Sequence, residues 1–507
     1  MQSPDPTASP LDHLPLRGVP DAAALITRDE IISYAALEKA VGQVASALQA
    51  LGLAAGDRVA TWLPKTRLAC IMPLAAARAG LVHVPVNPML KHSQVAHILA
   101  DSGARLLVTA QARRSALGEG DVPEGCRTIL DSELEAQAGT LTPLPASDAD
   151  VNALVAILYT SGSTGRPKGV MLSHANLWLG AVSVAHYLGI GAQDRVLGVL
   201  PLSFDYGQNQ LFSTWAAGGA VIPLDYLTAR DVVKAVERHD VTTLAGVPPL
   251  WTQLCDVDWP ADVAERLRRL TNSGGALTVP LVNRLAALFP NAALYPMYGL
   301  TEAFRSTYLE PALVAAHPTS MGKAIPFAEI MVVRADGEPA SVDEPGELVH
   351  AGPLVAQGYW QDAERTALRF RPAPAWSHHG GTAVWSGDTV RRDAEGLLYF
   401  VGRDDEMIKC AGNRISPTEI EEVAIASGVT SEAIALGVPD ARLGQSILLV
   451  ARGDGTDAAA LEQYFRRELP AFMQPQRIMW RESLPRNPNG KLDRAAIRIE
   501  MLEGAAS

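Results

Sequence analysis

The residues best suited to chemistry lie in a glycine-rich stretch at positions 159–169. Its candidate ligand groups are Thr160, Ser161, Gly162, Ser163, Thr164, Gly165 and Lys168. Glycines allow a tight turn that aims N–H groups inward, and hydroxyls and a lysine add donors and charge, so the stretch suits a polyphosphate. It is not a Walker loop, because Lys168 is followed by glycine. Apolar residues at 155–158 and 170–172 predict flanking strands, which favours a ligand-binding hairpin over a flexible Ser/Gly linker.

This loop resembles the phosphate loop of the adenylate-forming (AMP-binding) superfamily, which includes acyl-CoA synthetases, amino-acid adenylation domains and firefly luciferase. The segment Tyr298-Gly299-Leu300-Thr301-Glu302 resembles the second nucleotide motif of that family. The resemblance implies that Tyr298 packs on adenine, Thr301 meets the α-phosphate and Glu302 is the Mg²⁺ ligand. A carboxylate near phosphate oxygens is a reasonable site for this hard cation.

Later segments continue the family's motif order. Ser386-Gly387-Asp388 resembles the segment whose aspartate accepts hydrogen bonds from the ribose hydroxyls, a role that suits an acceptor-only carboxylate. The charged run at 402–406 resembles the hinge, with Arg403 near the ribose and Asp405 at the pivot. Residues 409–417, including Lys409 and Gly412, resemble the loop that faces the pantetheine arm of the thiol.

The last motif is Asn489-Gly490-Lys491, which resembles the segment whose lysine bridges the substrate carboxylate and the α-phosphate. A cation between two anions lowers their repulsion most in the transition state, where charge gathers at phosphorus. Each motif alone is more often a turn or a solvated surface. Their order along one chain supports the family assignment.

The resemblance implies a stand-alone acid–thiol ligase, and more weakly the ligases associated with bacterial exosortase systems. Such an enzyme uses ATP and Mg²⁺ to adenylate a small carboxylic acid, and transfers the acyl group to coenzyme A or to the phosphopantetheine of a separate carrier protein. The expected catalytic residues are Lys168, Thr301, Glu302 and Lys491. The expected nucleotide-binding residues are Thr160, Ser161, Gly162, Ser163, Thr164, Gly165, Lys168, Gly274, Gly275, Ala276, Tyr298, Gly299, Thr301, Asp388, Arg403 and Lys491.

The acid itself is left open between two classes. The loop 201–207 contains Phe204-Asp205, a pair that resembles amino-acid adenylation domains, in which the aspartate binds the α-ammonium of the substrate. A buried carboxylate needs such a partner, although Asp205 can also hydrogen-bond within its own loop. Leu300 stands where those domains usually have proline. The expected substrate pocket consists of Phe204, Asp205, Gly274 and Tyr298.

Alternating strand and helix patterns indicate how these residues are positioned. The sequence predicts a helix capped by Ser33 and closed at Gly52, strands at 58–63, 82–86 and 105–109, and helices between them. This rhythm continues through 196–295 and predicts a parallel sheet covered by helices. Loops after such strands, including 201–207, lie where open α/β sheets bind ligands.

The expected fold is α/β, with two domains joined by a hinge. A large N-terminal domain (1–402) contains parallel and mixed sheets with helices, and a small β-barrel-like portion. A hinge (403–406) leads to a small, mobile α+β C-terminal domain (407–507), in which Ser416 and Pro417 mark a helix start.

Composition excludes some alternatives. A net charge of −12 argues against a nucleic-acid partner. The longest apolar stretch, at 68–81, is interrupted by Arg78 and is too short for a bilayer, so we expect a cytoplasmic protein without membrane partners. A non-catalytic sensor would be expected to lack Lys491 or Glu302, and both are present. A luciferase-like oxygenase would share every motif and differ in its products.

Overall fold

The computed structural model describes residues 3–160, 167–277, 279–403, 407–485, 492 and 494–503. Backbone contacts divide the chain into two compact units. The first comprises Met1–Pro88, Val95–Tyr159 and Gly169–Asp404, and the second comprises Met89–Gln94, Thr160–Lys168 and Asp405–Ser507. The hinge predicted at 403–406 stays a prediction, because residues 404–406 lie outside the described part.

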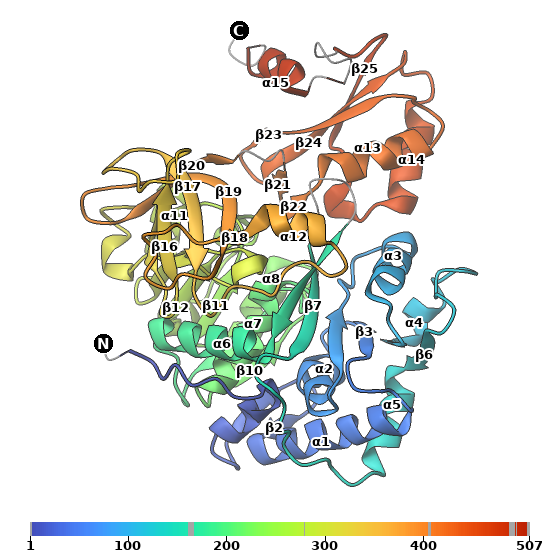
Figure 1. The fold of residues 1–507 in the computed structure, drawn as a ribbon, viewed down its shortest axis with the longest axis vertical. Coiled ribbons are helices and arrows are strands. Elements are labelled where there is room, and N and C mark those ends of the chain that lie inside the picture. The colour runs from blue at the N-terminus through green and yellow to red at the C-terminus, as the bar shows by residue number, and fades with distance from the viewer. Residues whose placement is uncertain are drawn as a thin grey trace. The chain divides into compact units, whose positions relative to one another are not determined.

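A six-stranded sheet is built from the first third of the chain (Figure 1). Its order is β6 (Arg127–Leu130), β5 (Leu106–Thr109), β3 (Arg58–Trp62), β4 (Val82–Pro85), β7 (Leu154–Thr160) and β8 (Lys168–Ser173). The first five strands pair in parallel. Parallel neighbours need long crossovers, which here include α2 (Arg67–Arg78), α3 (His92–Ser102), α4 (Gln111–Arg114) and α5 (Asp131–Gly139).

Local signals set the boundaries of several elements as the sequence predicted. Helix α1 (Tyr34–Ala50) begins after Ser33, whose Oγ accepts a hydrogen bond from the Ala36 amide at 3.2 Å. Gly52 follows the helix with φ +74°, a conformation that glycine adopts without strain. The strands predicted at 58–63, 82–86 and 105–109 are confirmed as β3, β4 and β5.

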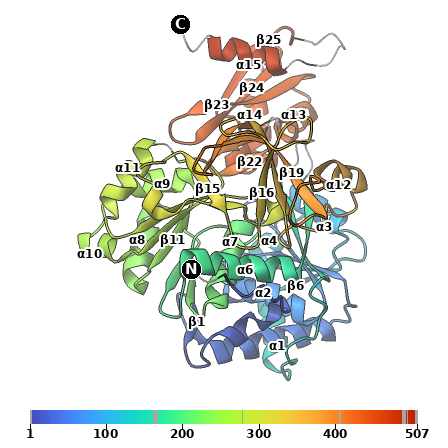
Figure 2. The ribbon, with the colours of Figure 1, turned by 60° about the vertical axis from the view of Figure 1, so that its left-hand side comes forward.

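A fourteen-stranded sheet dominates the first unit. Its parallel part runs in the order β13 (Ala293–Tyr298), β12 (Arg269–Asn272), β11 (Thr243–Gly246), β9 (Arg195–Gly198), β10 (Ala220–Pro223) and β1 (Ala23–Ile26), and β2 (Ile31–Ser33) adds an antiparallel edge. Helices α8 (Ala229–His239), α9 (Pro248–Cys255), α10 (Ala261–Arg266) and α11 (Val279–Leu288) gather beside β11 (Figure 2). The remaining helices of this region are α6 (His174–Leu188), α7 (Asp205–Ala216), α12 (Ala363–Arg369) and the 3₁₀ segments η1 (Leu11–Arg17), η2 (Thr301–Ala303) and η3 (Pro311–Leu313).

The expected β-barrel-like portion is wrong, because these strands do not close on themselves. Antiparallel pairing continues from β13 through β14 (Thr307–Tyr308), β15 (Ser320–Ala324), β20 (Leu398–Arg403), β19 (Thr382–Arg392) and β17 (Gly346–Ala351) to β16 (Glu329–Val333), with β18 (Phe370–Pro372) beside β19. Closure would require β16 to pair with β15. The edges of β15 are instead used by β14 and β20, so the described strands extend the parallel sheet.

The second unit contains a five-stranded sheet with its own core. The strand order is β22 (Asn413–Ile415), β21 (Ile408–Cys410), β24 (Gly444–Arg452) and β23 (Ala433–Asp440), and β25 (Arg477–Arg481) pairs with β24. Its helices are α13 (Pro417–Ala426), α14 (Ala458–Glu468), α15 (Arg494–Glu503) and the 3₁₀ segment η4 (Ala471–Met473). The predicted helix start is confirmed, since Ser416 Oγ accepts from the Glu419 amide at 3.4 Å. Ile420, Leu449 and Phe465 lie in the core.

Within the described ranges, the structure has no helix with the length and apolar character needed to span a membrane.

Candidate active site

Two of the predicted nucleotide segments meet in the first unit. Tyr298 is the last residue of β13, and its hydroxyl donates a hydrogen bond to Oδ2 of Asp388 on β19. Asp388 is buried, with 1% of its surface exposed. Its backbone neighbour on the adjacent strand is Arg403, the last residue of β20. Three residues expected to bind the adenosine part of the nucleotide therefore come together from separate parts of the chain.

Glu302 lies in η2, at the end of the motif that begins with this tyrosine, and is held by two residues that the motifs did not indicate. The residue is 4% exposed. The hydroxyl of Tyr359 donates to Glu302 Oε1 at 2.6 Å, and Arg369 Nε lies 4.0 Å from the same oxygen. Burial by itself lowers the pKa of Arg369. The charge of Glu302, together with Tyr359, Tyr298 and Asp388, outweighs this effect, so the pKa of Arg369 is raised overall. This surrounding favours the ionised carboxylate of Glu302.

The residues around Glu302 fit a Mg²⁺ ion that has a single carboxylate ligand from the protein. Mg²⁺ is commonly held by one or two carboxylates, substrate phosphates and waters. Among the described residues there is no group of three or more His, Cys, Asp or Glu side chains that could form a metal cage. A single oriented carboxylate therefore matches a cation that would be bound largely through a nucleotide.

Asp205 lies close to the same motif but opens a helix. The predicted loop 201–207 ends at Phe204, and Asp205 is the first residue of α7, where the helix dipole favours negative charge. Thr301 donates from its hydroxyl to Asp205 Oδ1 at 3.5 Å. Burial raises the pKa of Asp205, against the smaller lowering effect of the cation Arg305. Phe204 is half-buried and contacts the ring of Tyr206 edge-on, with centroids 6.1 Å apart.

Arg305 contacts the segment that contains Gly274, a further residue of the predicted pocket. No sequence motif indicated Arg305. The side chain donates from Nη1 to Ser273 Oγ at 2.8 Å, directly before Gly274, which has φ +79°. Gly299 allows this arrangement, since a Cβ there would lie 3.0 Å from the Arg305 Cα. In the same turn, Asn272 Nδ2 donates to the carbonyl of Gly275 at 2.9 Å. The segment Gly274-Gly275-Ala276 thus follows a residue that Arg305 contacts, and its predicted part in nucleotide binding stays a prediction.

The roles of the other predicted site residues stay predictions. Thr160 ends β7 and Lys168 begins β8, and the predicted donors between them, Ser161, Gly162, Ser163, Thr164 and Gly165, lie outside the described residues, as do Asp405 and Lys491. In the second unit, Lys409 lies on β21, where its amide donates to Gln445 Oε1 at 2.7 Å. Gly412, with φ +78°, forms the turn from β21 to β22.

Comparison with known families agrees with this architecture. Residues 15–360 match the family described as AMP-binding enzyme, and residues 419–491 match the AMP-binding enzyme C-terminal domain. The chain therefore belongs to the AMP-binding enzyme family. A solved structure of o-succinylbenzoate CoA synthetase from Bacillus subtilis superposes with a TM-score of 0.86 at 26% identity, covering 97% of this chain and 98% of that one.

Individual relatives differ in their substrates. Feruloyl-CoA synthase from Amycolatopsis sp is 32% identical over 498 residues, covering 94% of this chain and 96% of the relative. L-proline--[L-prolyl-carrier protein] ligase from Pseudomonas fluorescens is 29% identical over 496 residues, with coverages of 94% and 96%. The chain spans 6% and 9% of two much longer relatives, linear gramicidin synthase subunits C and B from Brevibacillus parabrevis.

Proposed function

We propose that this protein uses ATP to convert a carboxylic acid into its acyl-adenylate and then transfers the acyl group to a thiol. The main support is the hydrogen bond from Tyr298 to Asp388, which joins two motifs 90 residues apart at one buried position. Membership of the AMP-binding enzyme family, with acid–CoA and acid–carrier ligases among its relatives, supports the same reaction.

The chemistry assigns each residue a task. The acid attacks the α-phosphorus of ATP and expels pyrophosphate, which turns a poor acyl leaving group into a good one. Asp388 accepts hydrogen bonds from the ribose hydroxyls, Thr301 contacts the α-phosphate, and Lys168 with the glycine-rich loop binds the departing pyrophosphate. Lys491 aligns the substrate carboxylate with the α-phosphate. Mg²⁺ bound at Glu302 would neutralise phosphate charge.

The second half-reaction is assigned to the C-terminal region. We place the large domain at 1–402, the hinge at 403–406 around Asp405, and the small domain at 407–507. Rotation about the hinge would remove Lys491 and bring Lys409 and Gly412 to the thiol. The acceptor is coenzyme A or the phosphopantetheine of a carrier protein, because both kinds of ligase occur among the relatives.

Pyrophosphate release tests the first half-reaction. Purified enzyme is supplied with Mg²⁺ and ATP and a panel of carboxylic and amino acids, with and without coenzyme A. We expect acid-dependent pyrophosphate release, and thioester formation once the correct thiol is present. A panel that yields no pyrophosphate with any acid would argue for a non-catalytic nucleotide-binding protein.

Substitution of Lys491 separates the two half-reactions. Lys491→Ala should lower adenylation by about 100-fold or more, because a charge that stabilises the transition state is lost. The same variant should still transfer the acyl group from a supplied acyl-adenylate. Equal loss of both half-reactions would contradict the role given to Lys491.

An amino acid is the second candidate substrate. Asp205 is buried at 6% exposure, and a substrate α-ammonium would be a suitable partner for it. The similarity to the L-proline--[L-prolyl-carrier protein] ligase supports this reading. An amino acid and its des-amino analogue compared in the pyrophosphate assay separate the two classes, since an Asp205 that binds ammonium should reject the analogue.

A further inference from the structure

Arg305 is a buried cation whose hydrogen-bonding capacity is incompletely used. Only 2% of its surface is exposed. Its guanidinium lies 4.7 Å from the ring centroid of Tyr206 and donates from Nη1 to Ser273. Its Nε–H is buried and has no partner in the described part of the chain. A buried donor of this kind costs stability unless a ligand or a water satisfies it.

The backbone around Arg305 is built to hold it in place. Phe304, directly before it, has φ +63° and ψ −78°, which is a strained conformation for a bulky residue. The Phe304 ring packs on Gly180 of α6, where a Cβ would lie 2.4 Å from a ring atom. Glycines at 180 and 299 therefore make room for the arginine and its neighbour. Strain of this kind is typical of functional positions.

The charge of Arg305 disfavours an amine in the pocket. Its positive charge acts on Asp205 and is the main influence that lowers the pKa of that buried carboxyl. A substrate ammonium bound to Asp205 would lie near this cation and would take away its negative neighbour. An acid without an amine leaves the two protein charges to balance each other.

A small, mainly apolar cavity with a few polar side chains lies beside Arg305. Its volume is about 20 Å³, and its lining includes Tyr206, Asn209, Gln210 and Arg305. The side-chain oxygens Asn209 Oδ1 and Gln210 Oε1 are buried and, like Arg305 Nε, have no partner among the described residues. A cavity of this size holds one water-sized group.

A hydroxyl group can satisfy the donor and one of the acceptors at once. A hydroxyl accepts from Arg305 Nε–H and donates to the amide oxygen of Asn209 or Gln210. An ammonium cannot accept, an ionised carboxylate cannot donate, and a methyl group does neither. We infer that the substrate is a short, amine-free hydroxy acid and that Arg305 selects its hydroxyl; this inference rests on the proposed adenylation function.

Matched four-carbon acids test this selection. Pyrophosphate release is measured with butanoate, with its 2-, 3- and 4-hydroxy derivatives, and with 2-, 3- and 4-aminobutanoate. We expect one hydroxy acid to exceed butanoate and every amino acid by at least about 100-fold in kcat/KM, because a site built around a hydroxyl leaves buried groups unpaired with its analogues.

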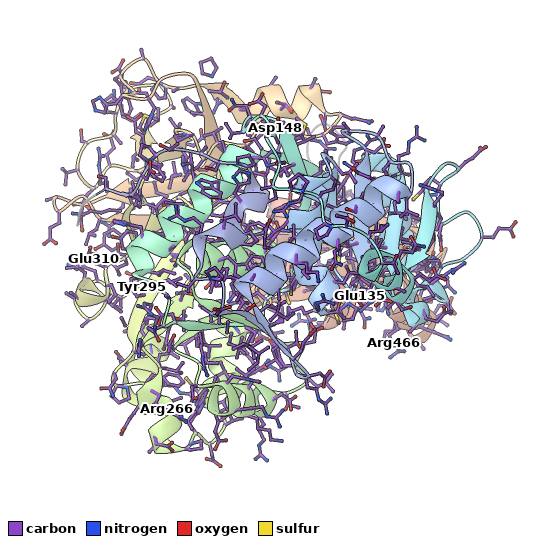
Figure 3. All side chains as sticks on the ribbon, turned by 90° about the horizontal axis from the view of Figure 1, so that it is seen from below. Glu135, Asp148, Arg266, Tyr295, Glu310 and Arg466 are labelled. Atoms are coloured by element: carbon purple, nitrogen blue, oxygen red, sulfur yellow. The ribbon has the colours of Figure 1, made fainter. Side chains whose placement is uncertain are left out.

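Arg305→Met removes the donor while keeping much of the side-chain volume. The preference for the hydroxy acid over butanoate should fall below about tenfold. The control is Arg266→Met, in which an exposed arginine paired with Asp240 is removed (Figure 3), and this variant should keep the wild-type preference. If Arg305→Met does not fold, Arg305→Lys keeps the charge without the Nε donor and should also lose the preference.

The outcomes separate this inference from the proposed function. If butanoate or an aminobutanoate is the best substrate, or if Arg305→Met keeps the hydroxyl preference, the selection by Arg305 is wrong and the adenylation function stands. If no acid in the wider panel releases pyrophosphate, the proposed function itself fails.

Discussion

Two buried carboxylates of the first unit lie in contrasting surroundings. Glu302 and Asp205 are 4% and 6% exposed; Glu302 ends the motif 298–302, and Asp205 accepts a hydrogen bond from Thr301 of that motif. Glu302 accepts from the Tyr359 hydroxyl at 2.6 Å and has Arg369 Nε within 4.0 Å. Asp205 receives a long hydrogen bond of 3.5 Å from Thr301, and no ion pair within 4.0 Å is formed between Asp205 and another described residue.

This difference indicates what each acid is for. The Tyr359 hydroxyl and the Arg369 guanidinium 4.0 Å away stabilise a negative charge on Glu302, as a ligand for a cation requires. Burial acts against the charged form of Asp205, whose pKa is raised. We infer that Glu302 serves the nucleotide and that Asp205 balances Arg305 in the acyl pocket.

The largest expected effect is the loss of adenylation activity when the charge of Glu302 is removed. Glu302→Gln keeps the shape of the side chain but removes its charge, and should lower adenylation by about 1,000-fold, since a group that stabilises phosphate charge is lost. Pyrophosphate release at varied Mg²⁺ and ATP measures this. Glu310→Gln, at an exposed position labelled in Figure 3, is the control and should stay near wild type. If Glu302→Gln lowers adenylation by less than threefold, the role that distinguishes Glu302 from Asp205 is wrong.

The next effect concerns the charge balance around Glu302. Arg369→Met removes the cation that lies 4.0 Å from the buried Glu302 carboxylate and should lower the free energy of unfolding by about 3 kcal/mol in urea titrations. The double variant Glu302→Gln/Arg369→Met should regain part of this loss. Arg365→Met, which removes a partly exposed pair with Asp362, should cost about 1 kcal/mol or less. Equal costs for both arginines would contradict the pairing.

A smaller effect tests the support of Arg305. Gly180→Ala places a Cβ 2.4 Å from the Phe304 ring, so we expect a loss of about 2 kcal/mol in stability and a weakened preference among acids. Gly139→Ala is a matched control, because no atom lies within 4 Å of the added Cβ. Unchanged stability and preference in Gly180→Ala would show that the ring is free to move.

The smallest effect is a pH dependence at Asp205. Its pKa is raised in the folded state, so the folded protein binds this proton more tightly than the unfolded chain does. The resulting stabilisation is complete below the ordinary carboxyl pKa and is lost as the pH rises through the raised value. Asp205→Asn cannot ionise, and should gain stability relative to wild type as the pH rises above the ordinary carboxyl pKa. Parallel urea titrations measure this, and a constant difference would argue against a raised pKa.

Parts of the fold and site follow from local sequence. The caps at Ser33 and Ser416 and the strands β3, β4 and β5 depend on neighbouring residues alone, and all were predicted. The family motifs likewise indicated Tyr298, Glu302 and Asp388. The sequence did not indicate that β15 and β20 belong to an open sheet instead of a barrel, because strand partners far apart in sequence leave no local signal. The start of α7 at Asp205 was also missed, within a stretch interpreted as a loop.

By itself, the sequence determined the family, the order of its motifs and the local limits of many helices and strands, since capping and apolar periodicity act over a few residues. Tertiary structure alone decided that Tyr359 and Arg369 hold Glu302, and that the charge of Arg305 acts on Asp205. Coulomb and hydrogen-bond energies depend on distance and burial, and both are set when distant segments pack together.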